Sequence, residues 1–290
     1  MRVDYYRKGI ISKFLEERLI VKNHSLYDIT NLGAILFGRD LTIFPKLKRK
    51  AVRVIIYGGK NKLKTTKEYS SNKGYAIDFE KIVEYIRDQL PTNEVIEKAF
   101  RKKIEMYPEI AIRELLANAI IHQDFSEGGT SSMVEIYSDR IEFTNPGKPL
   151  ISTQRFIDHP PQSRNEIMAG FLRRINVCEE RGSGVDKVIS AVEVFQLPAP
   201  NFTIESNFMK VVLYAHKTLR QMNKGDKIRA CYQHCALKHV SNEKMTNETL
   251  RKRFGIDDRN YPMASRIIKD TIEADLIRKE KGNRYVPFWV

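Results

Sequence analysis

The segment that most constrains the fold is PEIAIRELLANAIIHQDF at residues 108–125, because its apolar residues recur at helical spacing. They follow positions i, i+3, i+4 and i+7, the pattern of a helix packed against a core. A proline at the first position favours a helix start, since the first turn leaves its N–H groups unbonded. We therefore predict a helix with one buried face. The residues of this face are Ile112, Leu115, Leu116 and Ala119.

The same helix carries three polar residues on a neighbouring face. Glu114, Asn118 and His122 are each four residues apart, so their side chains stack along the helix. A carboxylate beside an amide can orient a water molecule and give one oxygen to a hard cation such as Mg²⁺. This pattern points to a nucleotide site, although an ordinary solvated helix face shows the same spacing.

Length and composition describe a chain of about two domains. The 290 residues fit the usual scale of roughly 100 to 200 residues per domain. With 42% hydrophobic and 30% charged residues, the chain is globular in composition and shows no signature of disorder. No apolar run approaches the roughly 18 residues that span a bilayer, and the start, MRVDYYRK, lacks the apolar core of a signal peptide. With only three cysteines, these features predict a cytoplasmic protein that has no membrane partner.

The net charge of +14 is unevenly distributed along the chain. Residues 216–290 hold 17 Lys and Arg against 9 Asp and Glu, and residues 39–73 hold 11 against 2. Residues 101–215 hold 13 against 15, so a nearly neutral middle lies between two basic segments. Clustered positive charge is typical of proteins that bind a polyanion, most often nucleic acid. A basic surface without any partner is the alternative.

Periodicity and turn residues predict the elements of the first half. A helix is expected over 5–19, and Thr30 is placed to cap a short apolar helix that ends at Gly38. A buried strand is predicted over 51–57, a loop over 60–74 and a helix over 78–90. A further strand over 99–106 precedes the helix that begins after Pro108.

The second half divides into two parts. Two strands are predicted over 133–137 and 141–144, with a sharp break at Asn145-Pro146-Gly147, then helices over 166–175 and 185–195 and a hairpin over 201–215. A domain boundary is predicted at 219–227. Beyond it the pattern becomes three helices, over 226–240, 246–254 and 261–274, and a basic hairpin that turns at Gly282-Asn283. Three helices followed by a hairpin form the winged helix-turn-helix pattern.

Five motifs along residues 27–214 give a family resemblance. They are TNLGAILFG at 30–38, YPEIAIRELLANAIIHQDF at 107–125, DRIEFTNPG at 139–147, SRN at 163–165 and ERGSGV at 180–185. In their order and spacing, this region resembles the family labelled RecG-like helicase C-terminal domain, or Schlafen-related transcriptional regulators. The helix and the motifs after it also resemble the GHKL ATP-binding superfamily of gyrase, heat-shock chaperones and histidine kinases.

The resemblance implies roles for particular residues. Glu114 would activate the attacking water as the catalytic residue, and Asn118 would bind Mg²⁺. The remaining positions implied to contact ATP are His122, Asn145, Gly147, Arg164, Gly182 and Gly184. The two last glycines would let the backbone approach phosphates at a helix start, an environment that favours anions. A lone GSG also occurs at ordinary helix starts.

Three departures limit what the resemblance implies. The superfamily aspartate that recognises the adenine amino group is replaced by Asn145, whose amide oxygen accepts a hydrogen bond without a charge. The sequence HQDF at 122–125 stands where the family usually has His-Arg-Asp-Tyr, which removes a cation. No G-x-x-x-x-G-K-S/T phosphate loop is present, so helicase activity is not expected.

The predicted winged helix offers a route to DNA. The N-terminal end of its third helix would read base edges, and the hairpin would contact phosphates. The predicted DNA-binding residues are Arg259, Asn260, Tyr261, Ser265, Arg266, Lys269, Arg278, Lys279, Lys281 and Arg284. Protein contacts are the alternative use of such a unit.

A cluster of cysteines and histidines in the first C-terminal helix superficially suits zinc. Cys231, His234, Cys235 and His239 fall at i, i+3, i+4 and i+8. One straight helix cannot surround a metal tetrahedrally, since the first and last of these are roughly 12 Å apart at 1.5 Å rise per residue. A buried core face is the prediction.

The sequence thus predicts an α+β protein: a GHKL-like α/β sandwich with a C-terminal winged helix-turn-helix domain. Its parts are an N-terminal segment over 1–106, an ATP-binding domain over 107–216 and the winged helix over 226–290. The expected function is a DNA-binding transcriptional regulator tuned by ATP and Mg²⁺, and a homodimer is a common state of such regulators. The alternatives are an ATPase acting with nucleic acid and a degenerate DNA- or protein-binding module. Many relatives carry an AlbA-type domain ahead of this region, so this chain is a short member or a fragment.

Overall fold

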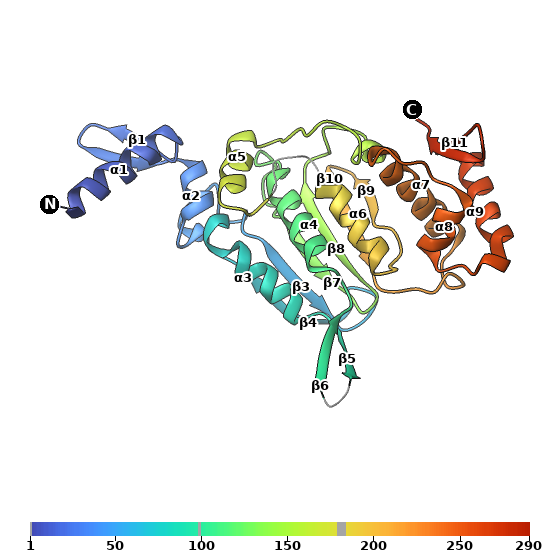
Figure 1. Cartoon of the computed structure of the whole chain (residues 1–290). Coiled ribbons are helices and arrows are strands. Elements are labelled where there is room, and N and C mark those ends of the chain that lie inside the picture. The colour runs from blue at the N-terminus through green and yellow to red at the C-terminus, as the bar shows by residue number, and fades with distance from the viewer. Residues whose placement is uncertain (1, 98–99, 179–183) are drawn as a thin grey trace.

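A six-stranded mixed sheet forms the centre of the molecule (Figure 1). The computed structural model describes residues 2–97, 100–178 and 184–290. The strand order is β4-β3-β7-β8-β10-β9, in which β3 and β7 are parallel and the other neighbours are antiparallel. The strands are β3 (Arg53–Tyr57), β4 (Thr65–Ser70), β7 (Met133–Ile136), β8 (Arg140–Pro146), β9 (Asn201–Glu205) and β10 (Phe208–Tyr214). The α+β class is confirmed.

Three helices cover one face of this sheet, α3 (Tyr75–Asp88), α4 (Glu109–Ile121) and α6 (Gly184–Val194) (Figure 1). Alternate residues of a strand face opposite sides. Ile141 and Phe143 of β8 accordingly pack with Ile112 of α4 in one hydrophobic cluster. All four residues of the predicted stripe on α4 are buried, so this prediction is confirmed.

The N-terminal part joins the sheet through a capped helix. It comprises α1 (Arg2–Glu16), the hairpin of β1 (Ile20–Asn23) and β2 (Leu26–Ile29), and α2 (Asn31–Phe37), which contacts α3. The Thr30 side chain accepts a hydrogen bond from the Gly33 N–H at 3.0 Å, which satisfies one open donor of the first turn. The predicted cap and the helix end at Gly38 are confirmed.

The C-terminal unit, residues 224–290, has a hydrophobic cluster of its own. It contains α7 (Lys224–Val240), α8 (Asn247–Phe254), α9 (Tyr261–Glu273), and the hairpin of β11 (Ile277–Glu280) and β12 (Arg284–Pro287). Gly282 and Asn283 both have positive φ, as a tight turn of primed type requires. The predicted sequence of three helices and a hairpin is confirmed.

The structure differs from the sequence predictions at five strands, of which β1 and β2 of the N-terminal hairpin were not predicted. The predicted loop over 60–74 is wrong, because β4 lies within it and pairs with β3. This edge strand is exposed along nearly its whole length, so it lacks the apolar alternation that identifies strands. The predicted strand over 99–106 corresponds to β6 (Phe100–Glu105), but its partner β5 (Thr92–Glu97) was not predicted. The two strands form a hairpin that projects from the body of the molecule (Figure 1). β8 continues through Pro146 rather than breaking at Asn145, since a proline at a strand end removes only one ladder donor.

In the part of the chain that the structure describes, no helix has the length and apolar character needed to cross a bilayer.

Candidate functional site

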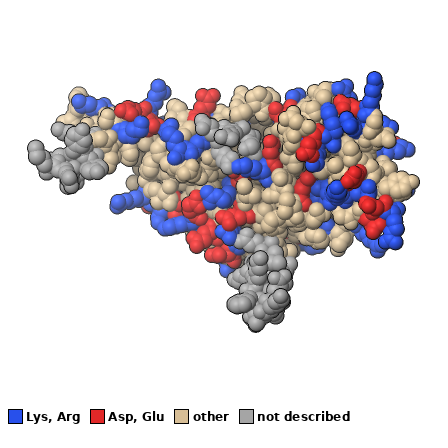
Figure 2. Space-filling view, in the orientation of Figure 1, with Lys and Arg blue, Asp and Glu red and all other residues tan. Residues whose placement is uncertain are grey.

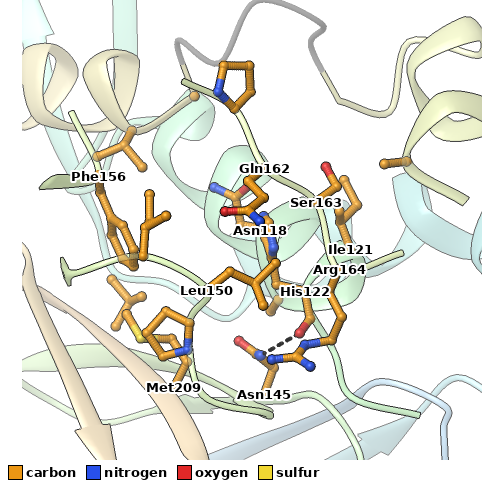
Figure 3. A pocket seen from close by; sticks show the side chains of 18 of the residues that line it. Asn118, Ile121, His122, Asn145, Leu150, Phe156, Gln162, Ser163, Arg164 and Met209 are labelled. Carbon is orange, nitrogen blue, oxygen red and sulfur yellow. Dashed lines mark hydrogen bonds between the residues drawn. The ribbon is translucent and has the colours of Figure 1, made fainter. Parts of the chain in front are cut away.

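A cavity of about 170 Å³ lies between α4, β8, β10 and the segment that follows β8. We call that segment, residues 148–164, the strap; it leads into α5 (Glu166–Arg174). Figure 3 shows the strap residues Gln162, Ser163 and Arg164 beside Asn118 and His122 of α4. The cavity therefore has one wall made of regular structure and another made of irregular chain.

The polar face of α4 lines this cavity. Glu114, Asn118 and His122, the three residues selected by their spacing, all border this one cavity. The first residue of α6 approaches the same face closely. A Cβ on Gly184 would lie 2.7 Å from Glu114 Oε2 and 3.8 Å from Asn118 Nδ2. Only glycine leaves the Glu114 carboxylate in its present position.

Asn145 lies at the floor of the cavity, on β8 (Figure 3). Its Nδ2 donates hydrogen bonds to the backbone oxygens of His122 at 3.4 Å and Pro146 at 3.2 Å. Both amide hydrogens are directed at carbonyl groups, so the side-chain oxygen is the group that remains for a ligand. The side chain is buried, and its neighbour Met209 on β10 also lines the cavity.

Gly147 adopts a backbone conformation that requires glycine. Its φ is +105°, and a Cβ there would lie 2.9 Å from Asp124 Cβ and 3.3 Å from Arg164 Nε. The chain can therefore leave β8 and pass directly beneath the Arg164 side chain. This close approach sets the start of the strap.

Arg164 fastens the end of the strap to the body of the protein. Its guanidinium lies 3.2 Å from Asp124 Oδ2 and donates to the Lys148 backbone oxygen at 2.6 Å. Hydrogen bonds from Ser126 lower the pKa of Asp124, and the charge of Arg164 acts in the same direction. Arg164 borders the cavity, and its charge is already matched by a carboxylate.

His122 is held in its neutral form. Burial lowers the pKa of the imidazole, and the nearby charge of Arg164 lowers it further. Since an unperturbed histidine titrates near pH 6.5, a lowered pKa leaves the ring uncharged at pH 7. It can then offer one donor and one acceptor nitrogen to a ligand.

Several cavity residues could not be found from the sequence. They come mostly from the strap and from the sheet, and they include Leu150, Phe156, His159, Arg173, Phe202 and Val211. Apolar walls around a few polar groups are typical of sites for small molecules. The strap has little regular structure, so no periodic pattern shows which of its residues face inward. Gly182 lies outside the described residues.

The ten predicted DNA-binding residues all lie on the C-terminal unit, and all are exposed. Figure 2 shows Lys and Arg side chains gathered over this end of the molecule, with acidic side chains among them. Arg259 is paired with Asp257 at 3.0 Å, and Lys269 with Glu273 at 3.7 Å. Arg278 donates to the Val290 backbone oxygen. For the other four basic residues of this set, Arg266, Lys279, Lys281 and Arg284, no ion pair is found among the described residues.

Three of the four cysteines and histidines that were predicted to form a buried face of α7 are buried, and His239 is partly buried. Cys231, Cys235 and His234 are buried, and the His234 Nδ1 lies 3.0 Å from Glu193 Oε2 of α6. In residues 2–97, 100–178 and 184–290, no three His, Cys, Asp or Glu side chains are grouped to hold a metal ion.

Comparison with known proteins finds a family match over the segment that contains the strap. The family model described as "Putative ATP-dependent DNA helicase recG C-terminal" matches residues 129–213. The match covers less than a third of the chain. The RecG C-terminal-type segment includes β7, β8, the strap, α5, α6 and β9. α4, with Glu114 and Asn118, lies ahead of the match.

One solved structure extends the likeness to the whole fold. The crystal structure of the DIP2311 protein from Corynebacterium diphtheriae matches 91% of this chain with a TM-score of 0.57 and 15% identity. This chain covers 55% of that protein's length. No curated protein matches the sequence. The similarity is therefore one of fold.

A partly buried acid near the start of α6 predicts a pH-dependent stability. Burial raises the pKa of Asp186 to about 6, and among the described residues its buried Oδ1 atom has no hydrogen-bond partner. A folded-state pKa above the unfolded value of about 3.9 means that ionised Asp186 destabilises the fold as pH rises through about 6. We expect Asp186→Asn to stabilise the protein by about 1–3 kcal/mol at pH 8 and by almost nothing near pH 4. Urea unfolding at both pH values measures this, and an equal effect at both would contradict it.

Proposed function

We propose that the protein is a DNA-binding transcriptional regulator whose GHKL-like domain binds ATP with Mg²⁺. In this proposal, residues 107–216 form the nucleotide-binding domain, residues 1–106 lead into it and residues 226–290 form a winged helix. The nucleotide tunes the affinity of the winged helix for DNA. The family of residues 129–213 supports an ATP-related role, and the regulatory role is our inference from the geometry.

The polar end of the cavity suits a metal-bound polyphosphate. Asn118 carries an oxygen that can coordinate Mg²⁺, which prefers oxygen ligands and keeps several waters. Gly184 begins α6 against this residue, so phosphate oxygens can approach the backbone where the helix dipole favours anions. Glu114 lies on the same side and can orient a water molecule.

The floor of the cavity suits an amino-substituted base. The Asn145 oxygen can accept a hydrogen bond from the amino group of adenine, while Leu150 and Met209 offer apolar contacts to the ring. Because the acceptor is a neutral amide and not a carboxylate, this contact is weaker than a charge-assisted bond. We infer that the base preference is modest.

The C-terminal unit presents the DNA-binding surface in this proposal. The start of α9, with Asn260, Tyr261 and Ser265 exposed, would enter the major groove. The basic side chains of the β11–β12 hairpin would contact phosphates, which position a protein on DNA without reading its sequence.

The observation that carries the regulatory part of the proposal is that α7 holds three parts of the nucleotide domain with three consecutive residues. The Tyr232 hydroxyl donates to the Gln154 backbone oxygen of the strap. Gln233 Nε2 donates to the Pro200 oxygen ahead of β9 at 2.8 Å. His234 pairs with Glu193 of α6. A movement of either cavity wall therefore acts on the first helix of the C-terminal unit.

Further contacts strengthen this connection. Trp289, from the end of the chain, donates its Nε1–H to the Tyr232 hydroxyl at 3.2 Å, and its ring lies 5.1 Å from the Arg155 guanidinium of the strap. Arg253 of α8 lies 3.3 Å from Glu193 Oε1. A small apolar cluster also joins the strap, α6 and α7. Its buried members are Ile157, Ile189 and Ala236.

The nucleotide site is tested with Asn118→Ala. We expect this variant to bind ATP in the presence of Mg²⁺ at least about tenfold more weakly, because it lacks the amide oxygen for the metal. Without Mg²⁺, variant and wild type should bind alike. Isothermal titration with and without Mg²⁺ measures both affinities, and Asn207→Ala, an exposed position, is the matched control. An Asn118→Ala protein that binds Mg-ATP as well as wild type would refute the assignment.

The DNA surface is tested with the double variant Lys281→Ala, Arg284→Ala. Each phosphate contact that is lost should lower the slope of log K against log salt by about 0.9. Fluorescence anisotropy with a labelled duplex at several salt concentrations gives this slope. The control is Lys46→Ala, Lys48→Ala, which removes equal charge from the exposed basic segment ahead of β3. If only the control changes the slope, DNA binds elsewhere.

The coupling is tested with Tyr232→Phe, which removes one hydroxyl and both of its hydrogen bonds. We expect wild-type DNA affinity to change on adding Mg-ATP, and this change to shrink by about half or more in the variant, because the strap no longer holds α7. DNA affinity without ATP should stay near the wild-type value. Tyr214→Phe is the control, since no hydrogen bond of its hydroxyl is found among the described residues. An unaltered ATP response in Tyr232→Phe would rule out this route.

A further inference from the structure

Two arginines border the cavity, and only one of them forms an ion pair with another described residue. Arg164 is paired with Asp124 and bonded to the Lys148 backbone, as described above. Arg173, from the last turn of α5, also lines the cavity. Within the described part of the chain, no carboxylate lies in ion-pair range of its guanidinium. Arg173 is therefore a partly buried cation whose charge has no match within the described protein.

The local packing leaves this guanidinium accessible from the cavity. It lies over Gly170, one turn earlier on α5, where a Cβ would be 3.6 Å from Arg173 Nη2. The next residue, Arg174, points elsewhere, because it pairs with Glu17 of the N-terminal segment at 2.5 Å.

Arg173 and Glu114 both act electrostatically on a third residue of the cavity. The thiol of Cys178, another cavity residue, is within electrostatic range of both groups. Burial raises the pKa of Cys178 to about 11, with the positive charge of Arg173 lowering it and the negative charge of Glu114 raising it. The end that holds Glu114 and Gly184 is where a polyphosphate would lie, away from the floor residue Asn145.

We propose that Arg173 is the cationic contact for the phosphate chain of the ligand, and that the ligand class is an anionic polyphosphate. Only the part of this inference that concerns the base of the ligand rests on the nucleotide-binding function proposed above. A guanidinium presents a planar fork of donors that matches two phosphate oxygens at once. Arg164 keeps the strap in place, and Arg173 balances the ligand charge.

The experiment compares ATP, adenosine and tripolyphosphate as separate probes. We expect Arg173→Ala to weaken binding of ATP and of tripolyphosphate by about tenfold to one hundredfold, since a hydrogen bond to a charged group is lost. Adenosine should bind the variant and the wild type equally. Arg173→Lys should recover part of the loss, because a point charge replaces the fork. Arg174→Ala, the neighbouring arginine outside the cavity, is the matched control.

The outcomes separate this inference from the proposed function. An Arg173→Ala variant that binds ATP and tripolyphosphate as wild type does would overturn the inference and leave nucleotide binding standing. A second outcome would uphold the inference and reject the nucleotide as the ligand. In that outcome the wild type binds no adenosine and binds ATP no more tightly than tripolyphosphate, while Arg173→Ala weakens tripolyphosphate binding. A purely structural role at the end of α5 would weaken adenosine binding as much as ATP binding, which would also overturn the inference.

Discussion

The packing of α4 against the sheet is the interaction on which the rest of the structure depends. One face of this helix is buried with Ile112 and Leu116 in the main cluster, so the rotation of the helix about its axis is fixed. That rotation points Glu114 and Asn118 into the cavity, since residues on neighbouring faces keep a constant angle. The approach of Gly184 follows, because α6 packs beside α4 and must leave space for the carboxylate. Core packing and site geometry are thus one constraint, and a cavity in the core would also displace the polar face.

Sequence patterns predicted the helices whose buried apolar residues recur at regular spacing. α4 and α9 carry regular apolar stripes, and the hairpin turn at Gly282-Asn283 needs residues that tolerate positive φ. β4 was missed because an edge strand exposed to water gains nothing from apolar alternation. The polar half of the site was predicted from spacing on one helix, whereas Arg173 was not. Its direction depends on how the short helix α5 is seated by the strap, which is a tertiary property without a local signal.

Buried contacts hold the connection between the two proposed domains, so it is not a flexible linker. Tyr232, Gln233 and His234 are all buried, and each bonds a different segment of the nucleotide domain. Consecutive helical residues point about 100° apart, so such a set surrounds much of the helix. α7 therefore belongs to the packing of both units. If a nucleotide changes DNA affinity through these contacts, linkage requires DNA to change nucleotide affinity by the same factor.

Charge placement explains why the cavity can be ready before a ligand arrives. A polyphosphate adds several negative charges beside Glu114, and such charges are costly to bury without cations. The pairing of Arg164 with Asp124 holds the strap but leaves little charge to compensate a ligand. Among the described residues that line the cavity, Arg173 has no ion-pair partner, so its guanidinium can contribute to this compensation, and Mg²⁺ would add to it in the proposed function. The ion pair of Arg164 already holds the strap, so the entropic cost of ordering the strap falls on folding. Closing this loop then does not reduce the free energy of ligand binding.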